Sequence, residues 1–304
     1  MSLPFDYSHC PPLSFGGALP VTKSFADAKA VILPVPLDRT TSYVPGTRNG
    51  PREILAASAQ VELWDEELQT DPHVHGIVTL PEMEMHYASM DECLAEVHRV
   101  AAAVMSHDKF LVTLGGEHSL TPPLVQAAVA KFGKLTVLQI DAHADLRDSY
   151  MDMPNSHACA MRRVLDHAPT VQVGIRNISE DEVKALPSLK AKIFYDWNMR
   201  DDGKWMDKVV DALGPKVYLT IDADGIDPSL MPAVGTPEPG GLTWPELTKL
   251  LRKVFAARDV VAADLVELCP LPGIASPNFV CAKLVYKMLG YKWASASSSS
   301  SSRR

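Results

Sequence analysis

The chain has 304 residues, of which 46% are hydrophobic and 22% charged, an ordinary balance for a globular protein with a large core. Its formal net charge of −8 argues against a nucleic-acid-binding protein, because such proteins carry clustered excess Lys and Arg. The lack of a long apolar run or a secretory signal pattern, with five scattered cysteines, predicts a soluble cytoplasmic protein with reduced thiols and no membrane contact.

Short apolar runs rich in β-branched residues are predicted strands, and helix-length amphipathic segments lie between them. In chain order, the predicted strands are residues 30–36, 110–114, 135–140, 171–175, 193–195, 217–221 and 260–266. The predicted helices are residues 90–106, 122–132, 207–213, 244–257 and 278–289. Continuous apolar strands separated by helices predict a parallel sheet covered on both faces. We therefore expect an α/β fold: a single-domain three-layer α/β/α sandwich with a mainly parallel sheet.

The predicted domain covers residues 1–293. The remaining segment, 294–304, contains six consecutive serines followed by two arginines. Such a composition cannot bury enough apolar surface to order itself, so we expect a disordered tail.

Polar and mostly acidic residues follow four of the predicted strands. They form the motifs G-G-E-H-S at 115–119, D-A-H-A-D at 141–145 and D-A-D-G-I-D-P at 222–228, and the last strand is followed by Glu267. Ligands of open parallel sheets bind beyond the carboxyl ends of the strands. We therefore expect these four segments to meet at one edge of the sheet.

Two histidines and four aspartates in these motifs form a candidate metal site. They are His118, Asp141, His143, Asp145, Asp222 and Asp224. Four carboxylates so close together would repel one another unless cations neutralise them. Each residue alone is more often a helix cap or a loop hydrogen bonder, but three motifs at one edge favour a metal site. A ligand set of oxygen and imidazole without thiolate suits Mn²⁺, or Ni²⁺ in its place, and predicts a two-metal hydrolase.

Four other features have a structural interpretation. Gly115 and Gly116 permit a tight backbone passage, since no phosphate-binding glycine motif is present. Asp227 before Pro228 is a turn residue, and Cys159 is a buried packing thiol.

These motifs resemble those of the ureohydrolases, the family of arginase, agmatinase and their relatives. The likeness spans about residues 30–290, and the flanks at 46–52, 156–163 and 235–241 are most similar to the agmatinase branch. It implies an arginase-like fold with two Mn²⁺ ions and a homo-oligomer, a trimer or a hexamer. The implied ligands are His118, Asp141, Asp145 and Asp222 for one ion and His143, Asp141, Asp222 and Asp224 for the other, with Asp141 and Asp222 bridging.

The resemblance also implies three catalytic residues. Glu267 grips the substrate guanidinium, Asp145 protonates the departing amine, and His157 relays protons to solvent. The products are urea and an amine. One departure is Cys269, which stands where the family more often has Asn after the glutamate.

The expected substrate is a small cationic guanidino compound, with agmatine, cleaved to putrescine and urea, as the first choice. Guanidinobutyrate, other guanidino acids, free guanidine and arginine stay open. One hypothesis is that Asp148 or Asp152, in the acidic loop before His157, attracts the distal ammonium of such a substrate, and the alternative is that the two acids belong to a solvated loop. Outside the family, the alternatives are a two-metal phosphoesterase, whose substrate Glu267 would repel, and a non-catalytic homologue, which the complete ligand set disfavours.

Overall fold

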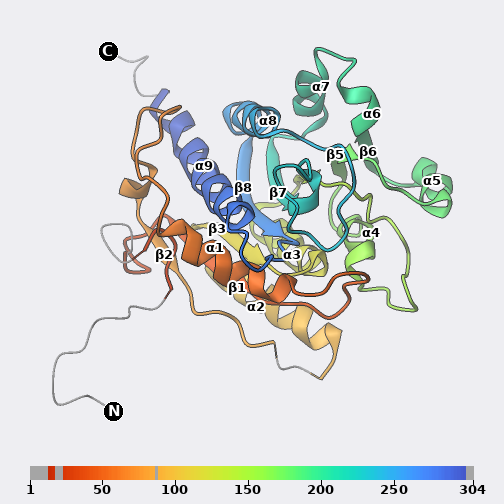
Figure 1. Cartoon of the computed structure of the whole chain (residues 1–304), viewed down its shortest axis with the longest axis horizontal. Helices are drawn as coiled ribbons and strands as arrows, with labels where there is room; N and C mark the ends of the chain where they lie inside the picture. The colour runs from red at the N-terminus through yellow and green to blue at the C-terminus, as the bar shows by residue number, and fades with distance from the viewer. Residues whose placement is uncertain (1–12, 18–22, 86–87, 299–304) are drawn as a thin grey trace.

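The computed structural model describes residues 13–17, 23–85 and 88–298. Their strands form one sheet in the order β2-β1-β3-β8-β7-β4-β5-β6 (Figure 1), and every neighbouring pair is parallel. The strands are β1 Ala30–Val35, β2 Ile77–Thr79, β3 Phe110–Gly115, β4 Thr136–Ile140, β5 Thr170–Ile175, β6 Ala191–Tyr195, β7 Lys216–Asp222 and β8 Asp259–Val266. The predicted α/β fold is confirmed, and the sheet is parallel throughout the described chain.

All seven predicted strands are present within a few residues of their expected ends, whereas β2 was not predicted. It has three residues and pairs with β1 alone, at the edge of the sheet. So short a run carries too little periodicity to be distinguished from a loop.

The α-helices cover both faces of the sheet. They are α1 Gly50–Ser58, α2 Met90–Ser106, α3 Thr121–Phe132, α4 Ala160–Val164, α5 Glu180–Ala185, α6 Asp196–Met199, α7 Trp205–Ala212, α8 Trp244–Ala257 and α9 Ser276–Ser298. The predicted bounds of α2 and α8 agree with the structure because each begins with a capping box, Ser89 with Glu92 and Thr243 with Glu246. The sequence pattern did not reveal α1, although Pro51 in its first turn is a helix-start signal.

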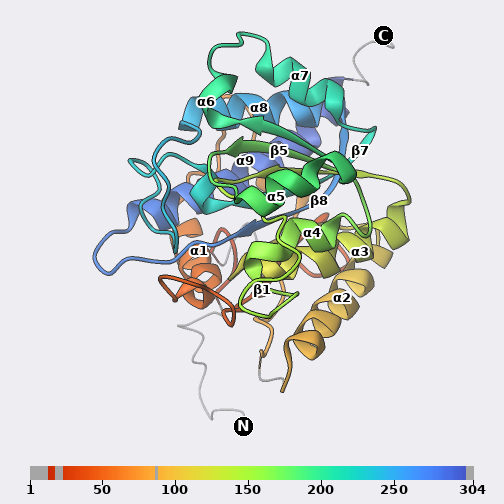
Figure 2. The ribbon, with the colours of Figure 1, turned by 90° about the vertical axis from the view of Figure 1, so that its right-hand side faces the viewer.

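Two apolar cores, one on each face of the sheet, produce the three layers. One core holds buried residues of α1, α7, α8 and α9, and the other holds those of α2, α3 and α4. Figure 2 shows α7 and α8 on one side of the sheet and α2 and α3 on the other. Along β1, Ile32 contributes to the first core and Leu33 to the second, because successive side chains of a strand point to opposite faces.

The final helix extends past the predicted end of the domain. We expected the last helix at 278–289 and a tail from 294, whereas α9 ends at Ser298, and residues 299–304 lie outside the described chain. The domain limits therefore stay a prediction. Within the described residues, no helix combines the length and apolar character needed to span a membrane.

A buried lysine ties α9 to the loop after α1. The Lys287 side chain is 2% exposed, and its Nζ lies 2.9 Å from Oδ1 of Asp65, whose side chain is fully buried. The same Nζ also lies 3.2 Å from Glu66 and 3.1 Å from Glu67. A buried carboxylate that loses its cation is strongly destabilising, because its charge has no compensation in the protein interior.

We expect Lys287→Met to lower the free energy of unfolding by about 3–5 kcal/mol, because it leaves Asp65 buried and unpaired. Urea denaturation measures this change. Lys283→Met is the matched control on the same helix, since Lys283 lies 3.5 Å from the exposed carboxylate of Glu66; its expected cost is below about 1 kcal/mol. Equal costs for the two variants would contradict this role of Lys287.

Candidate metal centre

The four predicted polar segments meet at one edge of the sheet. They follow β3, β4, β7 and β8, and these strands are neighbours in the sheet order β3-β8-β7-β4. Because all the strands are parallel, their carboxyl ends lie at the same edge. Residues up to about 150 positions apart in the chain are thereby brought into contact; for example, the His118 amide donates to Oε1 of Glu267 at 2.7 Å.

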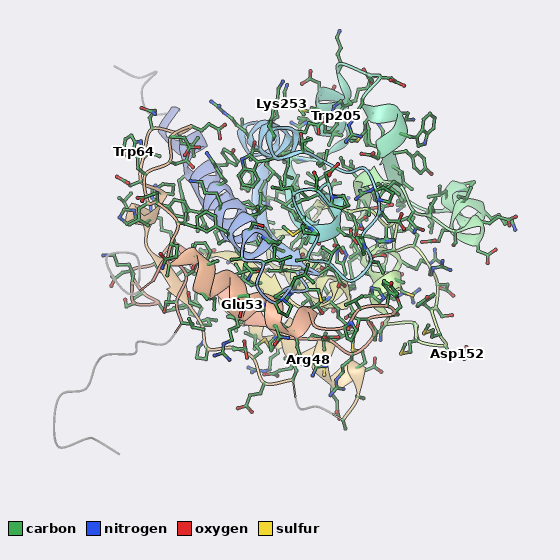
Figure 3. All side chains as sticks on the ribbon, in the orientation of Figure 1. Arg48, Glu53, Trp64, Asp152, Trp205 and Lys253 are labelled. Atoms are coloured by element: carbon green, nitrogen blue, oxygen red, sulfur yellow. The ribbon has the colours of Figure 1, made fainter. Side chains whose placement is uncertain are left out.

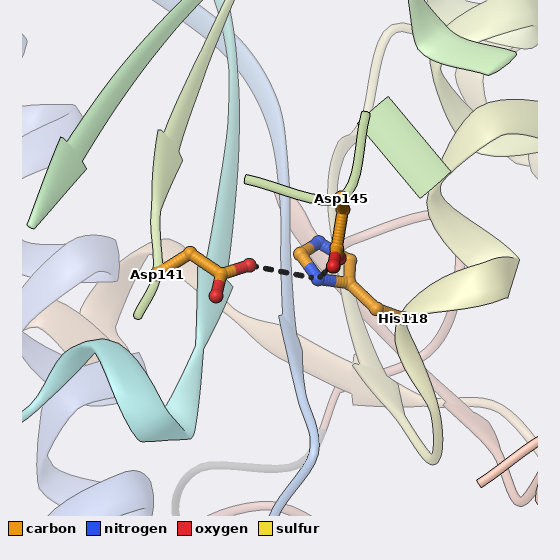
Figure 4. Close-up of side chains that lie close together, drawn as sticks. All are labelled: His118, Asp141 and Asp145. Carbon is orange, nitrogen blue, oxygen red and sulfur yellow. Dashed lines mark ion pairs between the residues drawn. The ribbon is translucent and has the colours of Figure 1, made fainter. Parts of the chain in front are cut away.

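The first candidate subsite surrounds one nitrogen of His118. Its Nδ1 lies 3.2 Å from a carboxylate oxygen of each of Asp141, Asp145 and Asp222. Figure 4 shows Asp141 and Asp145 converging on the imidazole ring. This Nδ1 is buried and has no hydrogen-bond partner. An unpartnered imidazole nitrogen among three carboxylates is the donor set of a divalent cation.

The other nitrogen of His118 sets the tautomer of the ring. Nε2 lies 2.9 Å from Oγ1 of Thr220, and Thr220 donates its own proton to Oδ1 of Asp264 at 2.6 Å. Thr220 must therefore accept from Nε2–H, which leaves the lone pair on Nδ1 facing the carboxylates. A histidine oriented in this way by an outer hydrogen bond is typical of metal ligands.

The second candidate subsite lies around His143. Its Nδ1 lies 2.9 Å from Oδ2 of Asp224 and 3.7 Å from Oδ1 of Asp141. Asp141 therefore faces His118 with Oδ2 and His143 with Oδ1. Its position between the two histidines supports the bridging role that the sequence resemblance implies.

A close backbone approach holds the two aspartate loops together. A Cβ atom added to Gly225 would lie 2.7 Å from the backbone nitrogen of Asp141, so the turn after β7 packs directly on the end of β4. The Asp224 carboxylate accepts from the Ala142 amide at 3.0 Å across the same contact. A side chain at position 225 would separate the two halves of the site.

The carboxylates of the site repel one another strongly. Burial, together with the charges of Asp224 and Asp145, raises the pKa of Asp141 to about 7. Burial and the charges of Asp224 and Asp141 also raise the pKa of Asp222 well above its usual range. In the metal-free protein, protons bound to the carboxylates relieve this repulsion. Divalent cations relieve it by displacing those protons. The residues therefore fit two divalent ions.

Glu267 lies beside the first subsite at the end of β8. Its backbone has a φ of 63°, a left-handed conformation that non-glycine residues seldom adopt. Its amide donates to the Gly116 carbonyl at 2.7 Å, which fixes the direction of the side chain. Burial and the charge of Glu117 raise the pKa of the Glu267 carboxyl well above its usual range. Backbone strain at a buried acid of this kind is typical of functional sites.

His157 is brought to the same site from the loop before α4. Its Nδ1 lies 3.7 Å from Oε1 of Glu267, and its amide donates to Oγ1 of Thr40 at 2.9 Å. Thr40 in turn donates to Glu117 at 2.7 Å. Glu117, the acidic residue of the G-G-E-H-S motif, therefore holds the loop that supports His157, and its side chain accepts hydrogen bonds from Arg39, Thr40 and Ser119.

A cavity of about 190 Å³ opens onto these groups. Six of its lining residues were predicted from the sequence: His143, Asp145, His157, Asp222, Asp224 and Glu267. Six others were not: Ser42, Arg147, Tyr150, Ala158, Asn177 and Thr236. A wider groove of about 630 Å³ near Arg52 and Pro270 contains none of the candidate metal ligands. The chemistry of the molecule is therefore expected in the smaller cavity.

One of the two acids in the loop before His157 is paired with arginines. Asp148 is exposed and lies 3.5 Å from Arg162 and 2.7 Å from Arg163, whose hydrogen bond lowers the pKa of the Asp148 carboxyl. Asp152 is exposed at the edge of the molecule (Figure 3). Because the charge of Asp148 is already compensated, we do not favour it as the group that attracts a substrate ammonium.

The structure agrees with the structural roles expected for Gly116, Asp227 and Cys159. A Cβ atom on Gly116 would lie 1.9 Å from the Leu37 carbonyl, so this position requires glycine. Asp227 accepts from the Ser229 amide at 2.9 Å, as a turn residue does. Cys159 is buried, and burial with the charge of Asp145 raises the pKa of its thiol to about 11.

Comparison with known proteins agrees with this geometry. The chain matches the Arginase family over residues 28–290. N(1)-aminopropylagmatine ureohydrolase of Synechocystis is 41% identical over 276 residues, which cover 88% of this chain and 90% of that protein. Agmatinase of Bacillus cereus is 32% identical over 272 residues, covering 88% and 92%. The crystal structure of agmatine ureohydrolase of Thermoplasma volcanium has a TM-score of 0.87 and 29% identity, covering 96% of this chain and 98% of that one.

The fold, the paired histidine and aspartate subsites and these relatives agree with one another. Residues of the family's binuclear metal site are present in this chain, and a guanidino substrate follows from the family. The chain belongs to the arginase family and is an agmatinase-like ureohydrolase.

Proposed function

We propose that the chain hydrolyses the guanidino group of N(1)-aminopropylagmatine, releasing urea and a polyamine. The observation that carries this function is the single small cavity shared by Glu267 and the carboxylates of both candidate metal subsites. The 41% identity to a relative named for this substrate, against 32% to an agmatinase, supports the aminopropyl compound. Agmatine, the first choice from the sequence, has the same guanidinobutyl group and is the second candidate.

The proposed ligands of the first ion are His118, Asp141, Asp145 and Asp222, and those of the second are His143, Asp141, Asp222 and Asp224. Mn²⁺ is the ion expected for this set of oxygen and imidazole donors, and Ni²⁺ accepts the same set. Such ions lower the pKa of water and so supply a nucleophile near neutral pH.

The protein residues orient the substrate and move its protons. Glu267 binds the planar guanidinium through charge-assisted hydrogen bonds and fixes its carbon in the cavity. The hydrogen bond from the His118 amide holds Oε1 of Glu267 in place for this role. Asp145 donates a proton to the departing amine nitrogen as the C–N bond breaks, because an amide anion is not a viable leaving group. His157, at the cavity wall, exchanges that proton with solvent.

Three further expectations stay predictions. They are a cytoplasmic location, assembly as a homo-trimer or homo-hexamer, and a single domain that ends near residue 293. Size-exclusion chromatography with light scattering measures the oligomeric state.

Mn²⁺-loaded protein is expected to release urea from N(1)-aminopropylagmatine and agmatine at least about tenfold faster than from arginine, guanidinobutyrate or guanidine, since one unmatched charged contact costs about that factor. A urea assay on the five compounds, with chelator-treated and Ni²⁺-loaded samples in parallel, measures this preference. Faster release from guanidinobutyrate would contradict the proposed substrate class. Hydrolysis of p-nitrophenyl phosphate without urea from any guanidine would support the phosphoesterase alternative.

A further inference from the structure

Glu238 is a carboxylate at the border of the active-site cavity. It lies in the loop between β7 and α8, and its side chain is 30% exposed. Its Oε1 accepts a hydrogen bond from Nδ2 of Asn177 and lies 4.0 Å from Nε2 of His143. Both Asn177 and His143 line the cavity, so the Glu238 carboxylate lies next to it.

Within the described residues, no Lys or Arg lies within 4.0 Å of the Glu238 carboxylate. The neighbouring acids differ in this respect. Asp148 is paired with two arginines, and Glu182 is buried and accepts hydrogen bonds from the Leu146 and Ser179 amides. Arg147, a cation that lines the cavity, stacks over the Tyr150 ring, and its Nε lies 4.0 Å from Glu182. The negative charge of Glu238 is therefore available to a ligand.

Arg176 holds the backbone of Glu238 in a fixed position relative to the metal site. Its guanidinium donates to the Glu238 carbonyl at 3.1 and 3.3 Å and to the Asp224 carbonyl at 2.6 Å. Gly241, with a φ of 106°, makes room for this contact, because a Cβ atom there would lie 2.9 Å from Nη2 of Arg176. The loop and the second metal subsite are thus linked through one side chain.

The ring of His143 lies between Asp224 and Glu238. Its Nδ1 faces Asp224 and its Nε2 faces Glu238, so Glu238 lies on the outer side of the ring, away from the candidate metal ligands. In the agmatine skeleton, four methylenes separate the guanidino group from the next amine, a span of about 6 Å when extended. A guanidinium held at Glu267 therefore directs a second positive charge outward.

We propose that Glu238 binds this amine, as an ammonium ion, and so selects guanidines that carry a cation four methylenes from the guanidino group. The inference rests on the proposed function and names the residue that recognises the second charge of its substrates. The competing role, orientation of the His143 ring, requires a hydrogen bond, and 4.0 Å is too long for one.

The test compares two guanidines that differ in this charge: agmatine, and n-butylguanidine, which has a methyl group in place of the aminomethyl end. Glu238→Gln is expected to raise KM for agmatine roughly tenfold to a hundredfold, the loss of one charged hydrogen bond. The kcat for agmatine, KM for n-butylguanidine and bound manganese are expected to stay unchanged. Gln keeps an oxygen that accepts from Asn177, so the loop is expected to fold normally.

Two other charge-removing variants complete the design. Glu180→Gln, on an exposed side chain paired with Lys184, is the control for lost surface charge and is expected to leave both KM values unchanged. Asp148→Asn tests the competing acid of the cavity mouth. A rise in KM for agmatine in Asp148→Asn, with none in Glu238→Gln, would overturn the assignment.

Equal changes for the two guanidines in Glu238→Gln, or loss of manganese, would also overturn it, because Glu238 would then act on the metal site. Failure of the wild-type protein to release urea from any guanidine would contradict the proposed function instead. Calorimetric titration with agmatine and n-butylguanidine still decides about Glu238 in that case. Weaker binding of agmatine alone in Glu238→Gln supports the inference, and unchanged binding overturns it.

Discussion

Asp141→Asn is expected to lower kcat for urea release by about a thousandfold or more and to reduce the bound manganese below one ion per chain. Among the described residues, Asp141 is the acid that lies within 4.0 Å of both subsite histidines, with Oδ2 at 3.2 Å from His118 and Oδ1 at 3.7 Å from His143. If Asp141 bridges the two proposed ions, its replacement by an amide would remove one negative charge from the surroundings of each, and a catalytic metal contributes several kcal/mol to the rate. Elemental analysis after dialysis measures the metal, and a urea assay measures kcat.

Asp227→Asn is the control for this experiment. Asp227 shares the D-A-D-G-I-D-P motif with Asp222 and Asp224, but it accepts a hydrogen bond from the Ser229 amide, which the amide oxygen of Asn also accepts. Its metal content and kcat are expected to match those of the wild-type protein. Full manganese content in Asp141→Asn would contradict the bridging role.

Glu267→Gln is expected to lower kcat/KM by about 10²- to 10⁴-fold while the bound manganese stays at the wild-type level. Two charge-assisted hydrogen bonds to a guanidinium are each worth about 1.5–3 kcal/mol, which converts to a loss of this size. Gln keeps an oxygen that accepts from the His118 amide, so the local backbone is expected to hold its left-handed conformation.

Comparison with the metal measurement separates the two possible roles of Glu267. A residue that binds the guanidinium affects turnover and leaves the ions in place, whereas a metal ligand affects both. Loss of manganese from Glu267→Gln, or a kcat/KM within tenfold of the wild-type value, would contradict the role in guanidinium binding.

The metal-site residues were predictable because two simple rules act together. Parallel strands bring their carboxyl ends to one edge, and D-A-H-A-D and D-A-D at those ends place His and Asp on the same side of an extended segment. Seven strands were predictable because they are apolar runs. Six of them are buried along almost their whole length, and β6, at the edge of the sheet, is only partly buried. The remaining strand, β2, is a three-residue edge strand, so its periodicity was too short to detect.

The supporting hydrogen bonds were less predictable. Asp264 lies inside β8, in a run otherwise apolar from Val260 to Val266, and an acidic residue in such a run is the signal that was available. Its partner Thr220, which orients His118, is an ordinary strand residue with no such signal. The place of Glu238 beside the cavity was not predictable, because it results from the contact between its loop and the end of β5, which local sequence does not encode.

The same limit applies to the loop before His157. Three charged residues there, Arg147, Asp148 and Asp152, are visible in the sequence, but their pairing depends on the fold. Asp148 contacts Arg162 and Arg163, which lie on α4. A charge count along the loop therefore did not reveal that Arg162 and Arg163 compensate the charge of Asp148.

The order of the strands has a consequence for how the protein folds. β8, the last strand among the described residues, lies between β3 and β7, and the pair β7-β8 joins β2-β1-β3 to β4-β5-β6. The two groups of three are contiguous in sequence, but they become one sheet only after residues 259–266 have been synthesised and inserted. Such non-local parallel pairing closes long loops and is slow. His118 and Asp141 therefore meet late in folding, and the nascent chain cannot assemble this site until residues 259–266 have left the ribosome.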